Sequence, residues 1–312
     1  MQVLITDDVH PLLLTELRQL GFAVRYEPAI DYQATLTMIT DYEGLVINSK
    51  ICVGEELLTK ATQLKWAVRL GSGMEVFDAE ACKAHGVQVY NTPEGNSNAV
   101  AEHTLGLLLN LMNNISKANH EVKQNQWLRE ANRGEELNGK TVGIIAYGNT
   151  GEAFGKVLKG FDVQLLAYDK YKKGFGNEQV KEATLQEIFE QADVLSLHLP
   201  LTAETAYMID EQFLNSFRKP IYLINTSRGK VLETAALLNA LESGKVKAAA
   251  LDVLENEKIS ELTTDEREWF DTLIQNKRVI MTPHIAGWTV ESKRKIAEVV
   301  VERVRAYLLL NK

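Results

Sequence analysis

Short apolar runs alternate with amphipathic stretches along the first part of the chain. Runs rich in aliphatic and β-branched residues, typical of buried parallel strands, occur at residues 3–6, 22–26, 45–48, 64–70 and 87–91. Apolar residues at helical spacing lie between them, at residues 11–20, 32–39, 55–60 and 78–85. This alternation predicts right-handed crossovers and a parallel sheet covered by helices, so we expect a small α/β unit here.

The same alternation resumes after a turn-rich crossing at residues 91–98 and a long helical pattern at residues 99–124. Strand patterns then occupy residues 141–145, 163–168, 194–198, 221–225, 248–251 and 279–281. Helical patterns occupy residues 185–191, 214–217 and 233–243, and a last helix is expected at residues 291–310. The pattern predicts a second parallel sheet, and we expect the last helix to return to the first unit.

Residues 140–169 predict a strand, a glycine turn, a helix, a second strand and then an acid. In the turn, Gly148 would let the backbone approach a pyrophosphate, and Gly151 would let the helix pack close to the strand. The amides at the helix N-terminus favour a bound diphosphate, and Asp169 can accept hydrogen bonds from the hydroxyls of an adenosine ribose. This stretch predicts a dinucleotide site; the alternative is a purely structural βαβ unit.

Two details modify that prediction. Ala146 stands where the fingerprint has its first glycine, and alanine fits there easily only if its φ is negative. Asp169 would repel a 2′-phosphate, so NAD is expected rather than NADP. Three lysines just after it, Lys170, Lys172 and Lys173, would partly offset that repulsion.

A second glycine-rich turn, at residues 69–74, follows the fourth predicted strand. Open α/β sheets bind ligands at the carboxyl ends of their strands, and glycines let consecutive amides point at an anion. The turn is therefore a candidate anion site, with a plain strand-to-helix connection as the alternative.

Reactive side chains follow the predicted strands of the second half. Arg228, Asp252 and His284 each come after a different strand, and Glu257 comes shortly after Asp252. Because the carboxyl ends of parallel strands share one edge, we expect these side chains to converge beside a bound nicotinamide. Taken singly, each is more typical of a surface ion pair or a structural residue. Together on one edge they favour a catalytic site.

These motifs together resemble the D-2-hydroxyacid dehydrogenase family over nearly the whole chain. The resemblance rests on residues 69–73, 91–93, 100–102, 146–151, 225–229, 250–253 and 282–285. It implies two doubly wound parallel-sheet α/β domains, with a Rossmann cofactor domain inserted into a flavodoxin-like substrate domain. The implied division is residues 1–98 and 288–312 for the substrate, and residues 99–287 for NAD.

The resemblance also implies roles. Arg228 would bind the substrate carboxylate and 2-oxygen, and His284 would exchange a proton with that oxygen. Glu257, rather than the nearer Glu255, would pair with His284 and favour imidazolium. The implied substrate contacts are Arg69, Ser72, Gly73, Met74, Arg228 and His284. The implied cofactor contacts are Ala146, Gly148, Asn149, Thr150, Gly151, Asp169, Pro200, Thr226, Ser227, Arg228, Asp252, His284 and Gly287.

The implied reaction is hydride transfer between NAD and a D-2-hydroxy acid or its 2-keto acid. Residues 45–139 look most like the phosphoglycerate dehydrogenases of the family, which favours 3-phosphoglycerate and the first step of serine biosynthesis. Asn48, where those enzymes often carry arginine, keeps glyoxylate and hydroxypyruvate open as substrates. The resemblance extends to NAD-sensing corepressors, so a non-catalytic binding protein is an alternative of a different class.

Composition limits the remaining possibilities. A chain of 312 residues suits two domains, and a net charge of -8 argues against sequence-independent nucleic-acid binding. No apolar run reaches membrane-spanning length, no basic leader precedes the first strand, and Cys52 and Cys82 make no metal or disulfide framework. We therefore expect a cytoplasmic protein without a metal site. The apolar surface of residues 99–124 and the stretch through Trp127 predict a homodimer.

Overall fold

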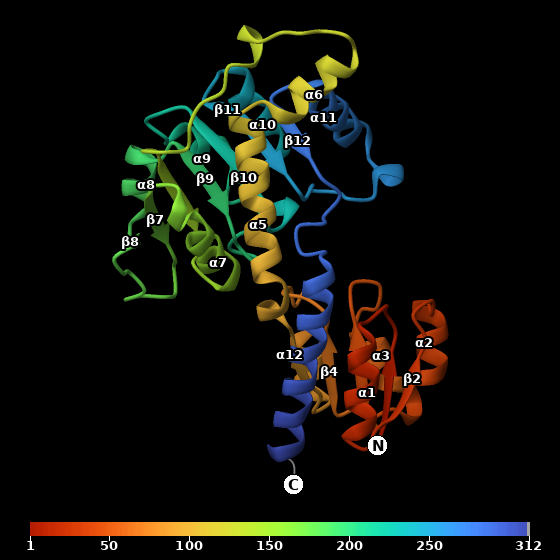
Figure 1. The fold of residues 1–312 in the computed structure, drawn as a ribbon. Helices are drawn as coiled ribbons and strands as arrows, with labels where there is room; N and C mark the ends of the chain where they lie inside the picture. Colours follow the sequence, from red (N-terminus) through yellow and green to blue (C-terminus); the bar gives the residue numbers. More distant parts are fainter. Residues whose placement is uncertain (311–312) are drawn as a thin grey trace. The chain divides into compact units, whose positions relative to one another are not determined.

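The computed structural model describes residues 1–310 and divides the chain into two compact units (Figure 1). Unit 1 contains Met1–Ser97 and the chain from Trp288 onward, and unit 2 contains Asn98–Gly287. Each unit has its own parallel sheet and its own core, as the alternating pattern predicted.

Unit 1 is built on a five-stranded sheet in the order β2-β1-β3-β4-β5. Its strands are β1 (Gln2–Ile5), β2 (Ala23–Tyr26), β3 (Gly44–Ile47), β4 (Trp66–Arg69) and β5 (Gln88–Tyr90), and all neighbours are parallel. This is the flavodoxin-like order, so the expectation for this sheet is confirmed.

Helices cover both faces of that sheet. They are α1 (Pro11–Gln19), α2 (Tyr32–Met38), α3 (Glu55–Lys60), α4 (Ala79–Ala84) and α12 (Val290–Leu310), with a 3₁₀ turn η1 (Ile39–Asp41) after α2. One face packs on α1 and α12, and the other on α2, α3 and α4. The last helix does return to the first unit: its Ala297, Val300 and Val304 are buried in the same core as Trp66.

Unit 2 is built on a seven-stranded parallel sheet in the order β12-β11-β10-β9-β6-β7-β8. The strands are β6 (Thr141–Ile145), β7 (Gln164–Tyr168), β8 (Val180–Glu182), β9 (Val194–Leu197), β10 (Ile221–Asn225), β11 (Val246–Leu251) and β12 (Val279–Met281). Counted from β6, this is the Rossmann order with one further strand, so the strand order reverses between β6 and β9, which are parallel neighbours. The predicted fold class is confirmed.

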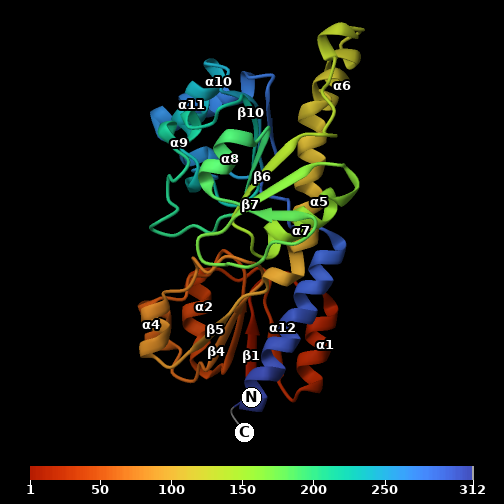
Figure 2. The ribbon, with the colours of Figure 1, turned by 90° about the vertical axis from the view of Figure 1, so that its left-hand side faces the viewer.

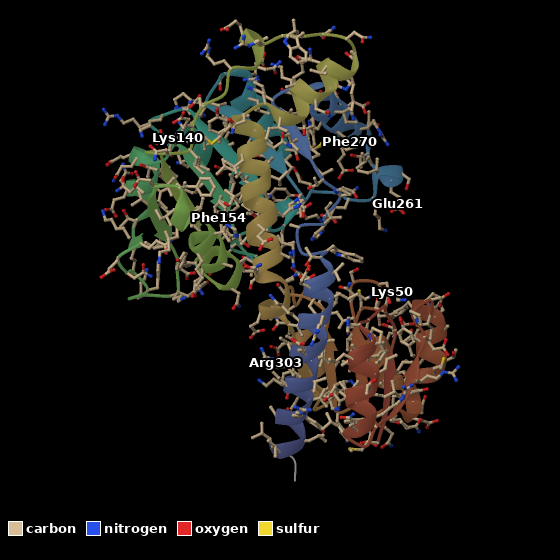
Figure 3. The ribbon with its side chains drawn as sticks, in the orientation of Figure 1. Lys50, Lys140, Phe154, Glu261, Phe270 and Arg303 are labelled. Atoms are coloured by element: carbon tan, nitrogen blue, oxygen red, sulfur yellow. The ribbon has the colours of Figure 1, made fainter. Side chains whose placement is uncertain are left out.

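The helices of this unit are α5 (Pro93–Met112), which begins in unit 1, α6 (Ile115–Lys123), α7 (Asn149–Val157), α8 (Leu185–Gln191), α9 (Glu211–Asn215), α10 (Thr234–Glu242) and α11 (Thr264–Gln275). Short 3₁₀ turns are η2 (Glu130–Asn132), η3 (Leu158–Gly160), η4 (Gly229–Val231) and η5 (Ile259–Glu261). One face of the sheet packs on α5 and α7, where Phe154 is fully buried, and the other packs on α8, α9 and α10 (Figures 1 and 3).

The structure corrects several predicted elements. The helix expected at residues 99–124 begins earlier, at Pro93, and is broken at Asn114, which has a φ of 54°. Asparagine tolerates that left-handed conformation, and the Asn110 side chain accepts from the Ser116 amide to start α6. The helix expected at residues 214–217 lies at Glu211–Asn215 instead, and β8 and α11 were not predicted.

Residues 113–134 form an arm that leaves and rejoins the body of unit 2, with α6 and its following loop extending beyond the sheet (Figure 2). At its base the Glu135 amide donates to the carbonyl of Met112 at 2.9 Å. The Glu135 carboxylate bonds Lys140 and Lys247, both at 2.9 Å, and these bonds lower the pKa of Glu135 to about 2. Lys140, labelled in Figure 3, immediately precedes β6 in the chain. The ends of the arm are therefore held together.

Across residues 1–310, no helix combines the length and the apolar character that crossing a bilayer would require.

Candidate functional site

The glycine turn leads directly into α7. Gly148 is the N-cap of that helix and has no side chain to bond the first amides. A Cβ added at Gly148 would meet nothing within 4 Å, whereas one added at Gly151 would collide with the carbonyl oxygen of Ala146. Asn149 and Thr150 form the first helical residues. The turn therefore has open space where a diphosphate would approach and a tight contact where helix meets strand, which fits a dinucleotide.

Ala146 has a φ of 69°, in the left-handed region. The condition under which alanine fits there easily, a negative φ, is not met. An L-residue in this conformation is strained by roughly 1–2 kcal/mol relative to glycine, because its Cβ crowds the following carbonyl. The backbone at Ala146 thus has the conformation that glycine favours, although the residue is alanine.

Asp169 follows β7 and is held by main-chain donors. Its carboxylate accepts from the amides of Tyr147 at 2.9 Å, Tyr171 at 2.9 Å and Lys172 at 2.8 Å. Burial alone would raise its pKa, but these three hydrogen bonds and the charge of Lys172 hold the pKa of Asp169 below its usual value. The acid stays ionised and is fixed against the glycine turn, with further acceptor capacity for ribose hydroxyls.

The candidate residues Arg228, Asp252 and His284 follow β10, β11 and β12, which are neighbouring strands. The Asn225 side chain organises the first of these strand ends: its amide donates to the carbonyl of Arg228, and its oxygen accepts from both the amide and the hydroxyl of Ser227. Thr226 is buried beside them. Gly229 approaches the carbonyl of Leu254 so closely that any Cβ would collide with it. The Arg228 turn is thereby fixed against the segment after β11.

His284 and Glu257 form the predicted pair. Nδ1 of His284 lies 2.9 Å from Oε2 of Glu257, and the two side chains are about half exposed. The ring Nε2 has no hydrogen-bond partner among residues 1–310. The backbone at His284 has a φ of 56°, an uncommon conformation for a residue with a Cβ. A histidine oriented through one nitrogen, with the other exposed, is the arrangement that proton transfer requires.

Asp252 has a more internal position than the sequence suggested. Its side chain is fully buried, and its carboxylate accepts from the Thr282 hydroxyl at 2.5 Å, the Ile285 amide at 2.9 Å and the Ala286 amide at 2.8 Å. Its carbonyl accepts from the amide of His284 at 2.8 Å. The clearest task of this acid is to hold the turn that carries His284.

Two polar residues of α5 touch the same strand ends and were not predicted from the sequence. Nε2 of His103 lies 3.1 Å from the Thr282 hydroxyl and 3.6 Å from the Asp252 carboxylate. The hydroxyl of the neighbouring Thr104 lies 3.0 Å from that of Thr226. The motif at residues 100–102 ends just before this pair, but only the fold brings residues so distant in sequence together.

The remaining predicted cofactor contacts, Pro200 and Gly287, lie after β9 and at the end of the His284 turn. Pro200 is exposed, and its carbonyl accepts from Thr205. Two residues earlier in the chain, His198 is buried beside Phe154, and burial lowers the pKa of His198 to about 3. This histidine is neutral at physiological pH.

In unit 1, the turn after β4 is held by residues 91–96. The Asn91 amide donates to the carbonyl of Ser72 at 2.6 Å, and the Ser72 hydroxyl donates to Asn96 at 3.1 Å. Arg69 is mostly buried and bonds Glu75 at 3.1 Å, so its positive charge is partly balanced. Gly73 is buried and Met74 is exposed. The turn after β4 thus carries one arginine whose charge is partly offset by Glu75.

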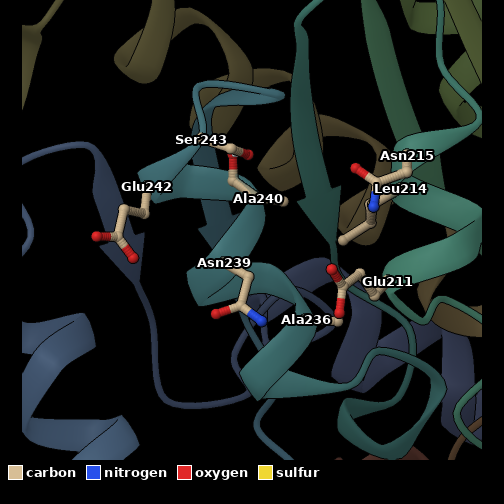
Figure 4. A pocket seen from close by; sticks show the side chains of 8 residues that line it. All are labelled: Glu211, Leu214, Asn215, Ala236, Asn239, Ala240, Glu242 and Ser243. Atoms are coloured by element: carbon tan, nitrogen blue, oxygen red, sulfur yellow. The ribbon is translucent and has the colours of Figure 1, made fainter.

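A depression of about 320 Å³ lies elsewhere, between α9 and α10 (Figure 4). It is lined by helix residues including Glu211, Asn239 and Glu242, and by none of the candidate residues at the strand ends.

A family model described as "D-isomer specific 2-hydroxyacid dehydrogenase, NAD binding domain" matches residues 105–286. D-3-phosphoglycerate dehydrogenase of Bacillus subtilis (strain 168) is 36% identical over 268 residues, which cover 84% of this chain and 49% of that protein. The chain thus spans about half the length of that relative. Hydroxypyruvate reductase of Thermotoga maritima is 33% identical, with 86% of each chain covered.

Among solved structures, D-lactate dehydrogenase from Aquifex aeolicus, complexed with NAD and lactic acid, superposes with a TM-score of 0.85 and 30% identity. The superposition covers 99% of this chain and 95% of the other. That similarity extends over both units.

Proposed function

Since this chain belongs to the D-isomer specific 2-hydroxyacid dehydrogenase family, we propose that it interconverts a D-2-hydroxy acid and its 2-keto acid with NAD. The observation that carries the proposal is the His284–Glu257 pair, on a strand edge that also carries Arg228. Unit 2 would bind the cofactor, and unit 1 would supply further substrate contacts.

The glycine turn and Asp169 would hold the cofactor. The open space at Gly148 and the amides of α7 suit a diphosphate, and Asp169 suits an adenosine ribose without a 2′-phosphate. Bound NADH would supply the hydride. We expect a higher kcat/KM with NAD than with NADP.

The chain's own residues would manage the proton and the substrate charge. Arg228 would bind the carboxylate with its planar fork, a geometry that lysine does not reproduce. His284 would deliver a proton to the ketone oxygen from Nε2 during reduction and take it back during oxidation. Glu257 would orient the ring through Nδ1. Asp252 would fix the turn rather than touch the reacting atoms.

We favour 3-phosphoglycerate as the substrate, which would place the enzyme at the first step of serine biosynthesis. Support comes from the similarity to D-3-phosphoglycerate dehydrogenase of Bacillus subtilis (strain 168) and from the sequence of residues 45–139. Hydroxypyruvate is the second candidate. The Arg69–Glu75 pair reduces the positive charge offered to a phosphate, and the second relative is a hydroxypyruvate reductase.

A substrate panel would separate these candidates. We expect reduction of phosphohydroxypyruvate, followed by the absorbance of NADH, to have a higher kcat/KM than reduction of hydroxypyruvate or glyoxylate. A preference for hydroxypyruvate would replace the substrate proposal and leave the reaction class intact.

His284→Gln tests the reaction itself. The variant keeps size and some hydrogen bonding but delivers no proton, so kcat should fall about 10²–10⁴-fold with little change in NADH binding. Arg228→Lys is the matched comparison, because losing the bidentate carboxylate contact should also raise KM. Near-parental turnover by His284→Gln would refute the mechanism.

We also infer a cytoplasmic homodimer. Both cysteines are free, as expected in a reducing compartment. The arm exposes Ile115, Val122, Trp127 and Leu128, with 55%, 48%, 78% and 45% of their surface accessible. Sedimentation should give a dimer for the parent protein and a monomer for Trp127→Glu. A monomeric parent at micromolar concentration would contradict this.

A further inference from the structure

The side chain of His103 bonds the turn that carries His284 to α5. Nε2 of His103 lies 3.1 Å from Oγ1 of Thr282, and that hydroxyl lies 2.5 Å from Oδ1 of Asp252. All three residues belong to unit 2. Asp252 and Thr282 both lie at strand ends, directly after β11 and β12. His103 lies on α5, so its contact joins these strand ends to a helix that packs on one face of the sheet.

Donor and acceptor accounting fixes the direction of these bonds. The hydroxyl of Thr282 donates its single hydrogen to the carboxylate of Asp252. The Thr282 oxygen can then only accept from His103, whose Nε2 must carry a hydrogen. His103 therefore acts as a donor, either as the Nε2-protonated neutral tautomer or as imidazolium.

This donor supports a strained turn. His284 has a φ of 56°, and its amide is bonded to the carbonyls of Asp252 and Thr282. A residue with a Cβ keeps such a conformation only when its surroundings specify it. Asp252 does so by accepting from Thr282, Ile285 and Ala286, and its charge is fully buried. The N–H of His103, 3.6 Å from that carboxylate, also helps to compensate the buried charge.

We propose that His103 is a positioning residue for His284, acting through Thr282 and Asp252. It does not touch substrate or cofactor in this role. It keeps the turn in the one conformation that presents Nε2 of His284 to the substrate. This inference rests on the proposed function, because the consequence for turnover requires His284 to be the proton donor.

The test uses full-length His103→Leu, His103→Gln and Thr282→Val. His103→Leu should lower kcat about 10-fold, the equivalent of one lost hydrogen bond to a charged network, with KM for NADH within about 2-fold of the parent. His103→Gln, which retains an N–H donor of similar reach, should recover most of that loss. A role confined to general stability would give no such recovery and no separation of kcat from KM.

Thr282→Val should lower kcat in the same way, and combining it with His103→Leu gives a double-mutant cycle. If the path runs through Thr282, His103→Leu should add little to the loss already caused by Thr282→Val. Additive losses would overturn the path. His85→Leu is the control: it removes an exposed histidine that is paired with Glu55 in unit 1, and kcat should be unchanged.

Amide hydrogen exchange separates this inference from the proposed function. Exchange at Ile285 and Ala286 should speed up in His103→Leu and Thr282→Val but not in His85→Leu, whatever the substrate. An inactive parent with this exchange pattern would reject the proposed reaction and keep the network. An active parent whose His103→Leu variant has unchanged exchange and unchanged kcat would overturn the inference.

Discussion

The two glycine turns of the chain, at residues 69–74 in unit 1 and 146–151 in unit 2, occupy equivalent places at the carboxyl ends of parallel strands. Their shapes are set in different ways. The turn of unit 2 takes its shape from close neighbours: Gly148 starts α7, and Gly151 packs on Ala146. The turn of unit 1 is held by side chains of residues 91–96, one strand further on.

This difference explains why one turn could be interpreted from sequence and the other only guessed. The shape of the turn at residues 146–151 depends on residues close in sequence, so the spacing of its glycines is enough to predict it. A turn held by Asn91 and Asn96 leaves no local pattern beyond its glycines. The net charge that this turn offers a ligand also depends on the ion pair between Arg69 and Glu75, which the glycine spacing does not reveal.

The largest expected effect comes from breaking the local turn. Gly151→Ala puts a methyl group against the carbonyl of Ala146, so the helix must move away from the strand. We expect unfolding stability to fall by about 1–3 kcal/mol, as for other overpacked sites, and NAD affinity to fall about 100-fold. Denaturant titration and NADH fluorescence measure the two quantities.

Gly148→Ala is the matched control, since its added Cβ meets nothing within 4 Å. Stability should stay within about 0.5 kcal/mol of the parent, as for surface changes, while NAD affinity falls because the methyl group occupies space meant for the diphosphate. Equal loss of stability in both variants would mean that the tight contact at Gly151 does not exist in solution.

The next effect is a pH dependence of the unfolding stability, which comes from the buried His198 of unit 2. The pKa of His198 is about 3 in the folded protein because burial disfavours its charge, against 6.5 for the free side chain. The unfolded chain therefore binds a proton that the folded chain does not, and stability falls as pH drops from 6.5 toward 3. The slope is about 1.4 kcal/mol per pH unit for one such group.

Urea unfolding between pH 8 and pH 4 would measure it. Among the six histidines, all within the described residues, only His198 is buried, so the loss should begin in unit 2. His198→Asn should flatten the pH dependence, while His85→Asn, a change at an exposed site in unit 1, should leave it. A slope identical in the parent and His198→Asn would assign the acid sensitivity to other groups.

A smaller effect should follow from loosening the turn of unit 1. Asn91→Ala removes the bond to the carbonyl of Ser72. We expect KM for the keto acid to rise about 5–10-fold, the equivalent of one hydrogen bond, with NAD affinity unchanged. Gln88→Ala, which removes an exposed amide bonded to Tyr90 in the same unit, is the control. A change in NAD affinity without a change in KM would reverse the roles given to the two turns.

The elements that the sequence predicted well are those with complete periodic patterns. The strands Ile221–Asn225 and Val279–Met281 and the helix Leu185–Gln191 were placed correctly because their apolar residues face a core. The break at Asn114 was missed because an apolar pattern continues across it. The unpredicted helix α11 begins with a capping box, Thr263 with Glu266, which is readable in the sequence.

The candidate site divides in the same way. Arg228, Glu257 and His284 could be named because strand ends and family motifs mark them, and the structure brings the last two within 2.9 Å. His103 could not be named, because its contact with Thr282 joins residues 179 positions apart in the sequence. The structural task of Asp252 could not be named either, because it depends on how the turn after β12 folds back onto this carboxylate. Their assignment requires the fold.

The smallest expected effect concerns Ala146, in the turn at residues 146–151. Ala146 has a φ of 69°, where glycine pays no steric cost and alanine does. Ala146→Gly should remove strain of roughly 1–2 kcal/mol, while the greater freedom of glycine in the unfolded chain returns part of it. We expect a net gain of about 0.5–1 kcal/mol in the free energy of unfolding, measured by urea titration, and unchanged affinity for NADH. The converse change in unit 1, Gly71→Ala at a φ of 155°, should destabilise, because that region excludes residues with a Cβ. If Ala146→Gly lowered stability instead, entropy alone would decide the outcome, and the turn in solution would have the negative φ that alanine prefers.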